Sequence, residues 1–474
     1  MASRPTIDVT FKQLATTLIE RSERGIAILL LNDSTAAEDK VYYWNYTTGE
    51  NTLSATVAGS TNTSNASSVT VSGTTYSTSL KMDSNAKITF STANSGTLSL
   101  VTYSTQTIPT VIIDDVEYGV STKGQTDIEL SAGSHTIVKG TTNTYLYYVG
   151  VKVLGTDGVI TNTYKTVADI NEELYTSESV AHIKKCLNYA PYEVIVISGA
   201  TVQFADFAPA ILKASSTGWI AFAGETSPQA DLASWIKSME LQDYTYKGIG
   251  TISGKDCKQY VYFNQTSTDT DGESLSAVDY LSSLLGIVAG CNVSRGCTNF
   301  LCTDLSSVDE VDDVDFAIDA GQLVLTNDIG GVRIVTGINS LVTLNGSTAT
   351  EDMQYIETVE AMNLIKDDIR EEFKTTYQGV FKNKYTNQML FIGAVNAYFD
   401  DLAAEDILDS EFDNKAEIDV DSQRSAWVGS GKSEAEDWDD DTVKSMAYKR
   451  TVFIAANVKI LNCMENLKFN VTME

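Results

Sequence analysis

The chain changes in texture near residue 41 and again near residue 154, and this double change restricts it to folds built from two different units. Between these points short runs of β-branched and aromatic residues alternate with turns of Gly, Asn and Ser. The segment carries 7 acidic and 5 basic residues and no cysteine, whereas the whole chain of 474 residues has a net charge of −30. This pattern predicts an antiparallel β-sandwich over 36–156, inserted into an acidic protein.

The segments that flank the insertion alternate between strand and helix. This alternation is typical of an α/β unit, and the apolar strands imply that helices cover both faces of the sheet. We expect strands at 26–31, 192–198, 217–224 and 258–264, and helices at 178–190, 228–241 and 275–290.

The C-terminal third begins with a predicted β-hairpin over 321–344 that turns near Gly330. Helices are expected at 356–373 and 388–408, a solvated irregular region of net charge −10 at 406–441, and strands at 451–461 and 467–473.

These patterns together predict a multidomain protein of α+β and α/β class, with mixed sheets flanked by helices and an inserted antiparallel sandwich of jelly-roll type. The expected parts are 1–35 as an N-terminal arm and the first piece of the core, 36–156 as the outward-facing sandwich, 157–319 as the α/β domain, and 320–474 as a C-terminal domain with its own arm.

Both ends of the chain alternate apolar and polar residues. The apolar residues are Ile7, Val9 and Phe11 at the start and Phe469, Val471 and Met473 at the end. Such a terminal strand either completes its own sheet or extends as an arm and adds to the sheet of a neighbouring molecule. The pattern alone leaves both uses open.

The sequence contains few residues that could form a catalytic or metal-binding site. The chain has 6 cysteines without a CxxC pair and only 2 histidines, His135 and His182, so we expect no metal site, no cofactor and no enzyme. The cysteines are expected to be reduced and mostly buried, and His182 is expected on a helix surface. A net charge of −30 disfavours nucleic acid as a partner, and the longest apolar run, at 26–31, is too short for membrane insertion.

An acidic run at 304–319 contains 7 acids and no base. It is interpreted as a linker or as a contact face for a basic partner, with weak cation binding as a further alternative.

Three segments resemble a known family. The sequences RPTIDVTFKQLATTLIERSERGIAILLLND (4–33), GQLVLTNDIGGVRIVTGINSLVTL (321–344) and KILNCMENLKFNVTME (459–474) resemble the tail sheath proteins of contractile phage tails and of phage-tail-like bacteriocins, and look most like the clostridial branch. The stretch LLGIVAGCNVSRGCTN (284–299) is similar to a helix of that family, although Cys291 stands where a proline is usual.

The resemblance implies a structural subunit that forms stacked hexameric rings, polymerises helically around a tail tube, and contracts to drive the tube through the target cell envelope. Arms at about 3–12 and 465–474 would donate strands to adjacent subunits, with hinges near 12 and 462–466, and 320–474 would face the tube. The implied partners are other copies of the chain, the tube protein, the baseplate and the tail terminator. The implied location is a virion tail or bacteriocin particle that is assembled in the bacterial cytoplasm.

The inserted segment resembles β-sandwich modules appended to polysaccharide lyases, on SLKMDSNAKITFSTANSGTLSLVTY (79–103) and TIVKGTTNTYLYYVGVKV (136–153). This resemblance implies a decoration of the sheath surface that is able to touch a host or mucosal glycan. Trp44, Tyr145, Tyr147 and Tyr148 are the candidate sugar contacts, and the alternative is that they fill the sandwich core.

Two other functions compete with the sheath. One is a surface polysaccharide-binding protein of the virion that mediates adhesion and has no contractile role. The other is a polysaccharide-degrading enzyme, which is disfavoured because the insertion lacks an acid pair in a recognisable setting.

Overall fold

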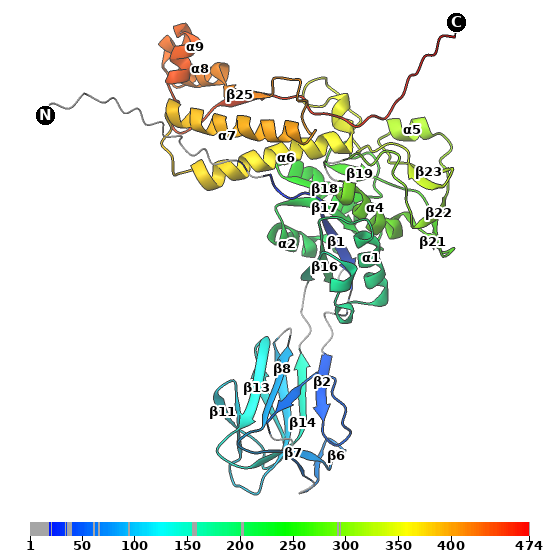
Figure 1. The fold of residues 1–474 in the computed structure, drawn as a ribbon, viewed down its shortest axis with the longest axis vertical. Helices are drawn as coiled ribbons and strands as arrows, with labels where there is room; N and C mark the ends of the chain where they lie inside the picture. The colour runs from blue at the N-terminus through cyan, green and yellow to red at the C-terminus, as the bar shows by residue number, and fades with distance from the viewer. Residues whose placement is uncertain are drawn as a thin grey trace, which may run out of the picture.

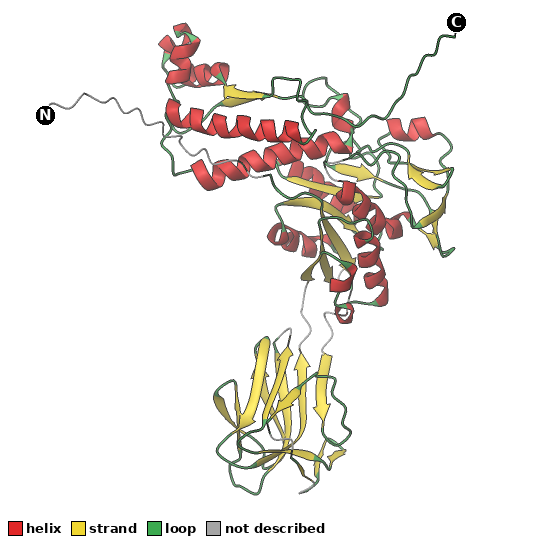
Figure 2. Cartoon of the chain, viewed as in Figure 1, coloured by secondary structure: helices red, strands yellow, loops and turns green. Residues whose placement is uncertain are grey.

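The computed structural model describes residues 19, 21–33, 35, 40–59, 62–64, 67–92, 95–153, 159–200, 203–291, 293 and 295–473. Figure 1 shows a β-sandwich at one end of the molecule, an α/β unit in the middle and a mainly helical unit at the other end. Figure 2 shows that helices are confined to the last two units.

A six-stranded sheet organises the α/β unit, with strand order β15-β16-β1-β17-β18-β19. All neighbours pair in parallel except β15 and β16, which are antiparallel. The strands are β1 (Ile26–Asn32), β15 (Val159–Tyr164), β16 (Glu193–Gly199), β17 (Thr217–Phe222), β18 (Thr245–Gly250) and β19 (Tyr260–Tyr262).

The sheet is covered by helices on both faces, as its apolar strands predict. Along β1, Leu29 packs in one hydrophobic core and Leu30 in another, because successive side chains point to opposite faces. Helices α1 (Ser177–Leu187) and α4 (Ala277–Cys291) contribute to the first core, and α2 (Phe204–Ala214) and α3 (Gln229–Leu241) to the second.

Smaller elements extend the first core. The hairpin of β23 (Leu325–Asp328) and β24 (Gly331–Ile334) turns at Gly330 as expected and packs into the core of the α/β unit. The expected domain boundary at 320 therefore falls ahead of a hairpin that belongs structurally to the α/β unit. The remaining elements here are β20 (Ser267–Asp269), β21 (Ser274–Leu275), β22 (Leu305–Val308), α5 (Val314–Asp319) and the 3₁₀ turns Val167–Asp169, Glu172–Leu174 and Glu351–Gln354.

The helical unit has its own core, between α6 (Ile356–Glu372), α7 (Tyr385–Ala404) and the two-stranded sheet of β25 (Lys415–Ile418) and β26 (Ile454–Asn457). A single π turn, Phe373–Tyr377, follows α6.

The prediction of an irregular region over 406–441 was wrong. This segment contains β25, α8 (Val420–Gly429), the 3₁₀ turn Ser433–Asp437 and the start of α9 (Asp440–Ser445). The acids are part of the reason: Asp419 accepts a hydrogen bond from the Ser422 amide and Asp439 from the Thr442 amide, so each caps a helix N-terminus.

The insertion is a sandwich of two antiparallel sheets around a separate core. One sheet has the order β11-β10-β13-β8-β3; the other has the order β12-β9-β14-β7-β4, with β2 paired to β14. Their bounds are β2 (Lys40–Asn45), β3 (Thr56–Ala58), β4 (Thr63–Ser64), β7 (Ser79–Met82), β8 (Lys87–Thr92), β9 (Gly96–Tyr103), β10 (Thr110–Ile113), β11 (Val116–Gly119), β12 (Lys123–Leu130), β13 (Gly133–Lys139) and β14 (Thr144–Val153), and β5 (Val69–Val71) and β6 (Thr74–Tyr76) form a separate hairpin.

The ends of the insertion lie side by side. Within the sandwich, Lys40 is the register partner of Val153. In the α/β sheet, Asn32 and Val159 are both register partners of Gly199, on opposite sides of β16. The two attachment points are therefore two strand spacings apart, roughly 10 Å. The strands before and after the insertion, β1 and β15, belong to the same sheet.

The predicted fold class is confirmed, and two local expectations differ from the structure. The sequence KQLATTLIERSERG also predicts a helix over 12–25; most of it lies outside the described residues, and Arg21–Gly25 form no helix. His182 is buried in α1 instead of lying on its surface, because α4 packs over it and Ser282 contacts its Nδ1 at 3.0 Å. Within the described part of the chain, no helix has the length and apolar character needed to cross a bilayer.

Candidate assembly arms and glycan-facing surface

The last described residues form an extended segment that leaves the body of the protein (Figure 1). The alternating apolar side chains are exposed: Phe469 by 78%, Val471 by 69% and Met473 by 90%. Among the described residues, no hydrogen bond joins 466–473 to the rest of the chain, so the strand expected at 467–473 has no partner within one molecule. Ile7, Val9 and Phe11 lie outside the described residues.

The root of this segment, in contrast, is tied down. The Cys463 amide donates to Glu357 Oε1 at 2.9 Å, and Thr358 Oγ1 donates to Asn462 Oδ1 at 3.0 Å. On the other side, Thr298 Oγ1 donates to Glu465 Oε1 at 2.5 Å. Residues 462–465 are therefore held by two separate elements, and the expected hinge at 462–466 is restricted to its last residue.

The N-terminal root is held by a buried cluster of charges. Arg24 Nη1 lies 2.9 Å from Asp367 Oδ2, and its Nη2 lies 3.5 Å from Glu360 Oε2. Lys247, from β18, pairs with the same Glu360, and all three of Arg24, Lys247 and Glu360 are almost fully buried. Next to this cluster, Asp368 accepts hydrogen bonds from the Ser22 amide and from Tyr398 Oη, at 3.3 and 2.7 Å.

The charges in this cluster stabilise one another against burial. Burial opposes ionisation of Glu360, but Lys247 and Arg24 outweigh it and lower the pKa of this carboxyl. Burial likewise opposes the charge of Arg24, but Glu360 and Asp367 together raise its pKa. The cluster is therefore ionised at neutral pH, and removal of one member leaves an uncompensated charge.

Helix α6 is the common anchor of both roots. Its first turn holds the C-terminal root through Glu357 and Thr358, and its later turns hold the N-terminal root through Glu360 and Asp367. A rise of 1.5 Å per residue sets the two ends of this anchoring surface roughly 15 Å apart. A movement of α6 therefore moves both roots together.

A potential acceptor for a foreign strand lies in the same unit. The sheet of β25 and β26 has only these two strands among the described residues. On the outer side of β25, the Ala416 amide and carbonyl bond to the Asn396 side chain of α7, so the open edge is that of β26. An open strand edge presents unpaired amide and carbonyl groups, which an added strand satisfies.

The candidate glycan contacts of the sandwich fall into two groups. Trp44 points into the sandwich core, where it stacks on Tyr46 with ring centroids 4.6 Å apart. Tyr145, Tyr147 and Tyr148 lie on the opposite side of their sheet, in a small second cluster. A β-bulge at 146–148 puts Tyr147 and Tyr148 on the same face.

Burial separates the three tyrosines. Tyr147 is fully buried, and its hydroxyl donates to the Ser67 carbonyl. Tyr145 and Tyr148 remain half-exposed. The ring of Tyr148 lies over Gly150, where a Cβ atom would come within 2.3 Å of it, so a larger residue at this position would displace the ring.

Two further tyrosines, Tyr43 and Tyr76, contact Tyr148. We call these three residues the tyrosine strip. Tyr43 stacks on Tyr148 with centroids 5.6 Å apart, and Tyr76 approaches it at 5.7 Å. Burial, with the neighbouring Tyr76 and Tyr43 hydroxyls, raises the pKa of Tyr148 to about 12. Its hydroxyl therefore stays protonated and able to donate a hydrogen bond.

Beside the strip, one row crosses the sheet from strand to strand. Lys123 is the register partner of Tyr103, Tyr103 of Tyr145, and Tyr145 of Lys81. We call this row the lysine–tyrosine rung. It places two aromatic rings between two ammonium groups, over roughly 15 Å at ordinary strand spacing.

Sequence reasoning missed Tyr43, Tyr76, Tyr103 and the two lysines of this face. The alternation in KVYYWN would have placed Tyr43 opposite to Trp44, and hence outside the core. The rung depends on strand register, which the sequence pattern does not specify.

All six cysteines are described and none forms a disulfide, with Cys463 exposed and the other five buried. In the described part of the chain, no group of three or more His, Cys, Asp and Glu side chains could hold a metal ion.

Comparison with known proteins identifies relatives of two parts of the chain, the C-terminal region and the sandwich. The family of phage tail sheath C-terminal domains matches residues 348–474, which include α6, both β25 and β26, and the exposed C-terminal segment. Residues 348–474 are therefore similar to the C-terminal domain of phage tail sheath proteins. A tail sheath protein of Clostridium phage phiCD119 is 28% identical over 245 residues, which cover 51% of this chain and 67% of the phage protein.

The sandwich matches a different family, carbohydrate binding module 77, over residues 40–149. The predicted recognition of a clostridial-type sheath protein with an inserted carbohydrate-module-like sandwich is thus confirmed. Two solved structures are also similar. A sheath complex of an extracellular contractile injection system in its contracted state has a TM-score of 0.49 and 9% identity, covering 67% of this chain and 88% of that one. A protein from a study of glycan recognition by the Ruminococcus flavefaciens cellulosome has a TM-score of 0.22 and 27% identity, covering 25% of this chain and 97% of that one.

Proposed function

We propose that this chain is a structural subunit of a contractile tail sheath, in which each copy passes its terminal segments to adjacent copies around an inner tube. The observation that carries the proposal is the exposed apolar segment 466–473, which is unpaired although its root at 462–465 is fixed to the body. A soluble protein gains nothing from displaying alternate apolar side chains on a free strand unless another molecule covers them. The sheath relatives support the same role, which is structural and not catalytic.

The outer edge of β26 is the proposed acceptor, because it lies in the region that matches the sheath family and has no strand paired to it among the described residues. Pairing of five or six residues would add about four to six main-chain hydrogen bonds, each worth about 1 kcal/mol net. One such contact is weak, but a lattice repeats it at every subunit. The proposed location is therefore the tail of a virion or of a bacteriocin particle, with the tube, baseplate and terminator as further partners.

Electron microscopy of the purified chain tests the polymer. We expect rings or tubes for the full chain and only monomers after deletion of 466–474, with unchanged circular dichroism. Tubes that persist after the deletion would show that this segment is not the link. Deletion of 1–11 examines Ile7, Val9 and Phe11 in the same way.

The sandwich is proposed to project outward from the sheath. It is attached after Asn32, the last residue of β1, whereas Arg24 just before the first residue of β1 contacts α6. A strand of this length spans roughly 23 Å. The helical unit, proposed to face the tube, and the sandwich therefore lie at opposite ends of the same buried strand (Figure 1).

We further propose that the sandwich binds a polysaccharide through the tyrosine strip and the lysine–tyrosine rung. Tyrosine rings offer flat apolar faces to sugar rings, and their hydroxyls donate hydrogen bonds. Lys81 and Lys123 favour a glycan that carries carboxylate groups over a neutral one.

Binding of the full chain to immobilised acidic and neutral polysaccharides tests this role. We expect Tyr148→Ala and the pair Lys81→Ala with Lys123→Ala to weaken binding at least tenfold. Lys87→Ala, on the other sheet, is the matched control and should bind normally. Absence of binding to every polysaccharide would leave the sandwich as decoration alone and would not affect the sheath proposal.

The competing function, a virion adhesion protein without a contractile role, shares the glycan surface but needs no polymer. Rings or tubes of the purified chain would exclude it. A strictly monomeric chain that binds glycan would favour it.

A further inference from the structure

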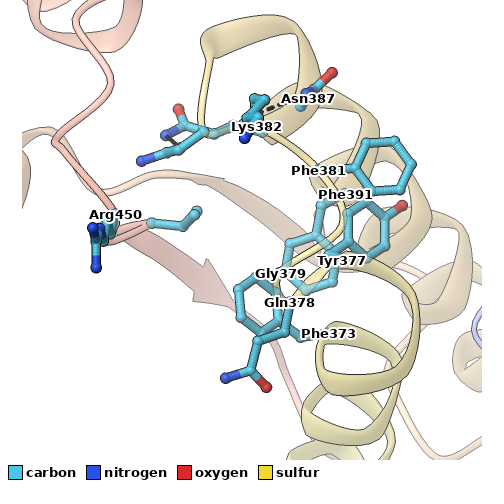
Figure 3. Close-up of a pocket in the computed structure, with 12 residues that line it drawn as sticks. Phe373, Tyr377, Gln378, Gly379, Phe381, Lys382, Asn387, Phe391 and Arg450 are labelled. Atoms are coloured by element: carbon cyan, nitrogen blue, oxygen red, sulfur yellow. Dashed lines mark hydrogen bonds between the residues drawn. The ribbon is translucent and has the colours of Figure 1, made fainter.

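A cavity of about 170 Å³ opens at the turn between α6 and α7. Figure 3 shows the rings of Phe373, Tyr377 and Phe391 grouped around it. Their centroids are close: 5.3 Å from Phe373 to Phe391 and 4.8 Å from Tyr377 to Phe391. We call this cavity the aromatic pocket. A cavity of about 150 Å³ with apolar walls can hold benzene, so the aromatic pocket has room for one phenyl ring.

The pocket has polar atoms that lack partners. Tyr377 Oη and Gln388 Oε1 belong to side chains that are 95% and 97% buried, and neither atom has a hydrogen-bond partner. A buried polar group without a partner is costly, and both of these atoms belong to side chains that line the pocket. The π turn at 373–377 widens the backbone at this point, and such turns often occur at functional sites.

The rim of the pocket is apolar and positively charged. Phe381 lines the pocket and is 41% exposed, and its sequence neighbour Val380 is 67% exposed. The stretch 373–399 contains three lysines and no acid, in a chain of net charge −30. The side chain of Asn383 donates to the Tyr448 and Thr451 carbonyls at 3.1 and 3.0 Å, which holds the exposed residues Lys449 and Arg450 beside this rim.

These cations have no internal counter-charge in the described part of the chain: Lys382, Lys384, Lys449 and Arg450 take part in no ion pair there. The surface is therefore complementary to a partner that presents an aromatic or aliphatic side chain surrounded by carboxylates.

One segment of the chain has this composition. Helix α5 exposes Phe316 by 72%, and Asp312, Asp313 and Asp315 lie within four residues of it in sequence. We call α5 with its flanking acids the acidic knob. Its acids form no ion pair among the described residues. Nearby, Glu310 accepts a hydrogen bond from the Asn327 amide, which fixes the knob to the β23–β24 hairpin.

The aromatic pocket and the acidic knob lie on opposite sides of the part of the molecule away from the sandwich: α5 is on the right in Figure 1, and the turn from α6 to α7 is on the left. They cannot meet within one copy. A contact between two different surfaces of identical molecules is heterologous, and repetition of it without closure produces a helical array.

We infer that the aromatic pocket receives Phe316 of a second copy of this chain, with Lys382 and Arg450 facing the acids of the knob. This contact is separate from the exchange of terminal strands. The inference rests on the proposed sheath function in one respect: copies of the chain must come together in one polymer. It gives the acidic run at 304–319 the role of a contact face for a basic partner.

Cross-linking tests the contact on the full-length chain in a Cys463→Ser background, which removes the one exposed thiol. A Phe316→Cys chain is mixed with a Val380→Cys chain and oxidised with copper–phenanthroline. We expect a covalent dimer that forms at least tenfold faster than in a mixture of Phe316→Cys with Leu241→Cys, whose exposed residue lies outside the pocket. Equal rates in the two mixtures would overturn the inference, even where electron microscopy shows tubes of the parent chain.

Charge exchange provides the second measurement. Lys382→Glu with Arg450→Glu should raise the concentration needed for assembly at least tenfold. Mixing with a chain that carries Asp312→Lys and Asp315→Lys should restore it. Normal assembly of the first variant together with loss of tube binding would mean that the pocket holds the tube protein, and would contradict the inference. Failure of the parent chain to assemble would instead count against the proposed sheath function, and the cross-linking of monomers would still decide the contact.

Discussion

The burial of two residues, His182 and Tyr147, could not be predicted from the sequence pattern. His182 lies in the run VAHIKK, which looks like a solvated helix surface, yet it is buried because α4 packs on that side of α1. Tyr147 follows the alternation of its strand, but the β5–β6 hairpin covers it and leaves Tyr145 and Tyr148 accessible. In both cases the deciding neighbour is far away in sequence.

The burial of His182 has a measurable consequence. Burial, assisted by Lys185 and opposed by Asp279, lowers the pKa of His182 from 6.5 to about 4. Between these values the unfolded chain binds a proton that the folded chain does not, so the free energy of unfolding decreases as pH falls from 6.5 to 4. The full loss is about 3 kcal/mol. Hydrogen exchange of α1 and α4 should show this loss in the natural protein and a smaller one in His182→Gln. The same pH dependence in both would contradict the assignment.

The buried charges make a second prediction at this scale. Glu360→Ala leaves Lys247 and Arg24 buried with too little negative charge, so it should lower the free energy of unfolding by about 3–5 kcal/mol. Glu371→Ala removes only an exposed pair with Lys374 and should cost less than about 1 kcal/mol. Urea unfolding of the two variants compares them directly, and equal effects would show that the cluster does not hold the units together.

Among the elements, those with a strong apolar period were predictable from sequence, and those defined by neighbours were not. The helix expected at 178–190 is α1, and that expected at 356–373 is α6 with its π turn. In contrast, α8 and α9 were hidden by the acidity of 406–441, where Asp419 and Asp439 act as helix caps. The anchoring role of α6 was also invisible, because it depends on contacts with residues more than 100 positions away.

Helix α6 gives a prediction for the arm root. Glu357→Ala removes the acceptor of the Cys463 amide and should increase the exchange rate of that amide about tenfold, the effect of losing 1–2 kcal/mol. Glu351 lines the same hollow beside the arm root as Glu357 and Cys463, but it accepts no hydrogen bond from the Cys463 amide, so Glu351→Ala should leave the exchange unchanged. An unchanged rate in Glu357→Ala would mean that the root is held in another way.

At the scale of the whole molecule, the division into a body and an insertion was readable from composition, but the side-by-side position of the insertion ends was not. Since Asn32 and Val159 flank the same residue of β16, a linker of about six residues can replace 36–156. The shortened chain should fold, and it should polymerise like the full one while losing glycan binding. Loss of folding would show that the sandwich supports the body.

The central claim is that the terminal segments complete the sheets of other copies. Cryo-electron microscopy of the assembled polymer measures this directly, because it traces each chain from the root at 462–465 to its end. The account predicts that 466–473 lies as a strand along the β25–β26 sheet of an adjacent copy. A map in which both chain ends fold back onto their own molecule, with no strand passing between copies, would contradict it.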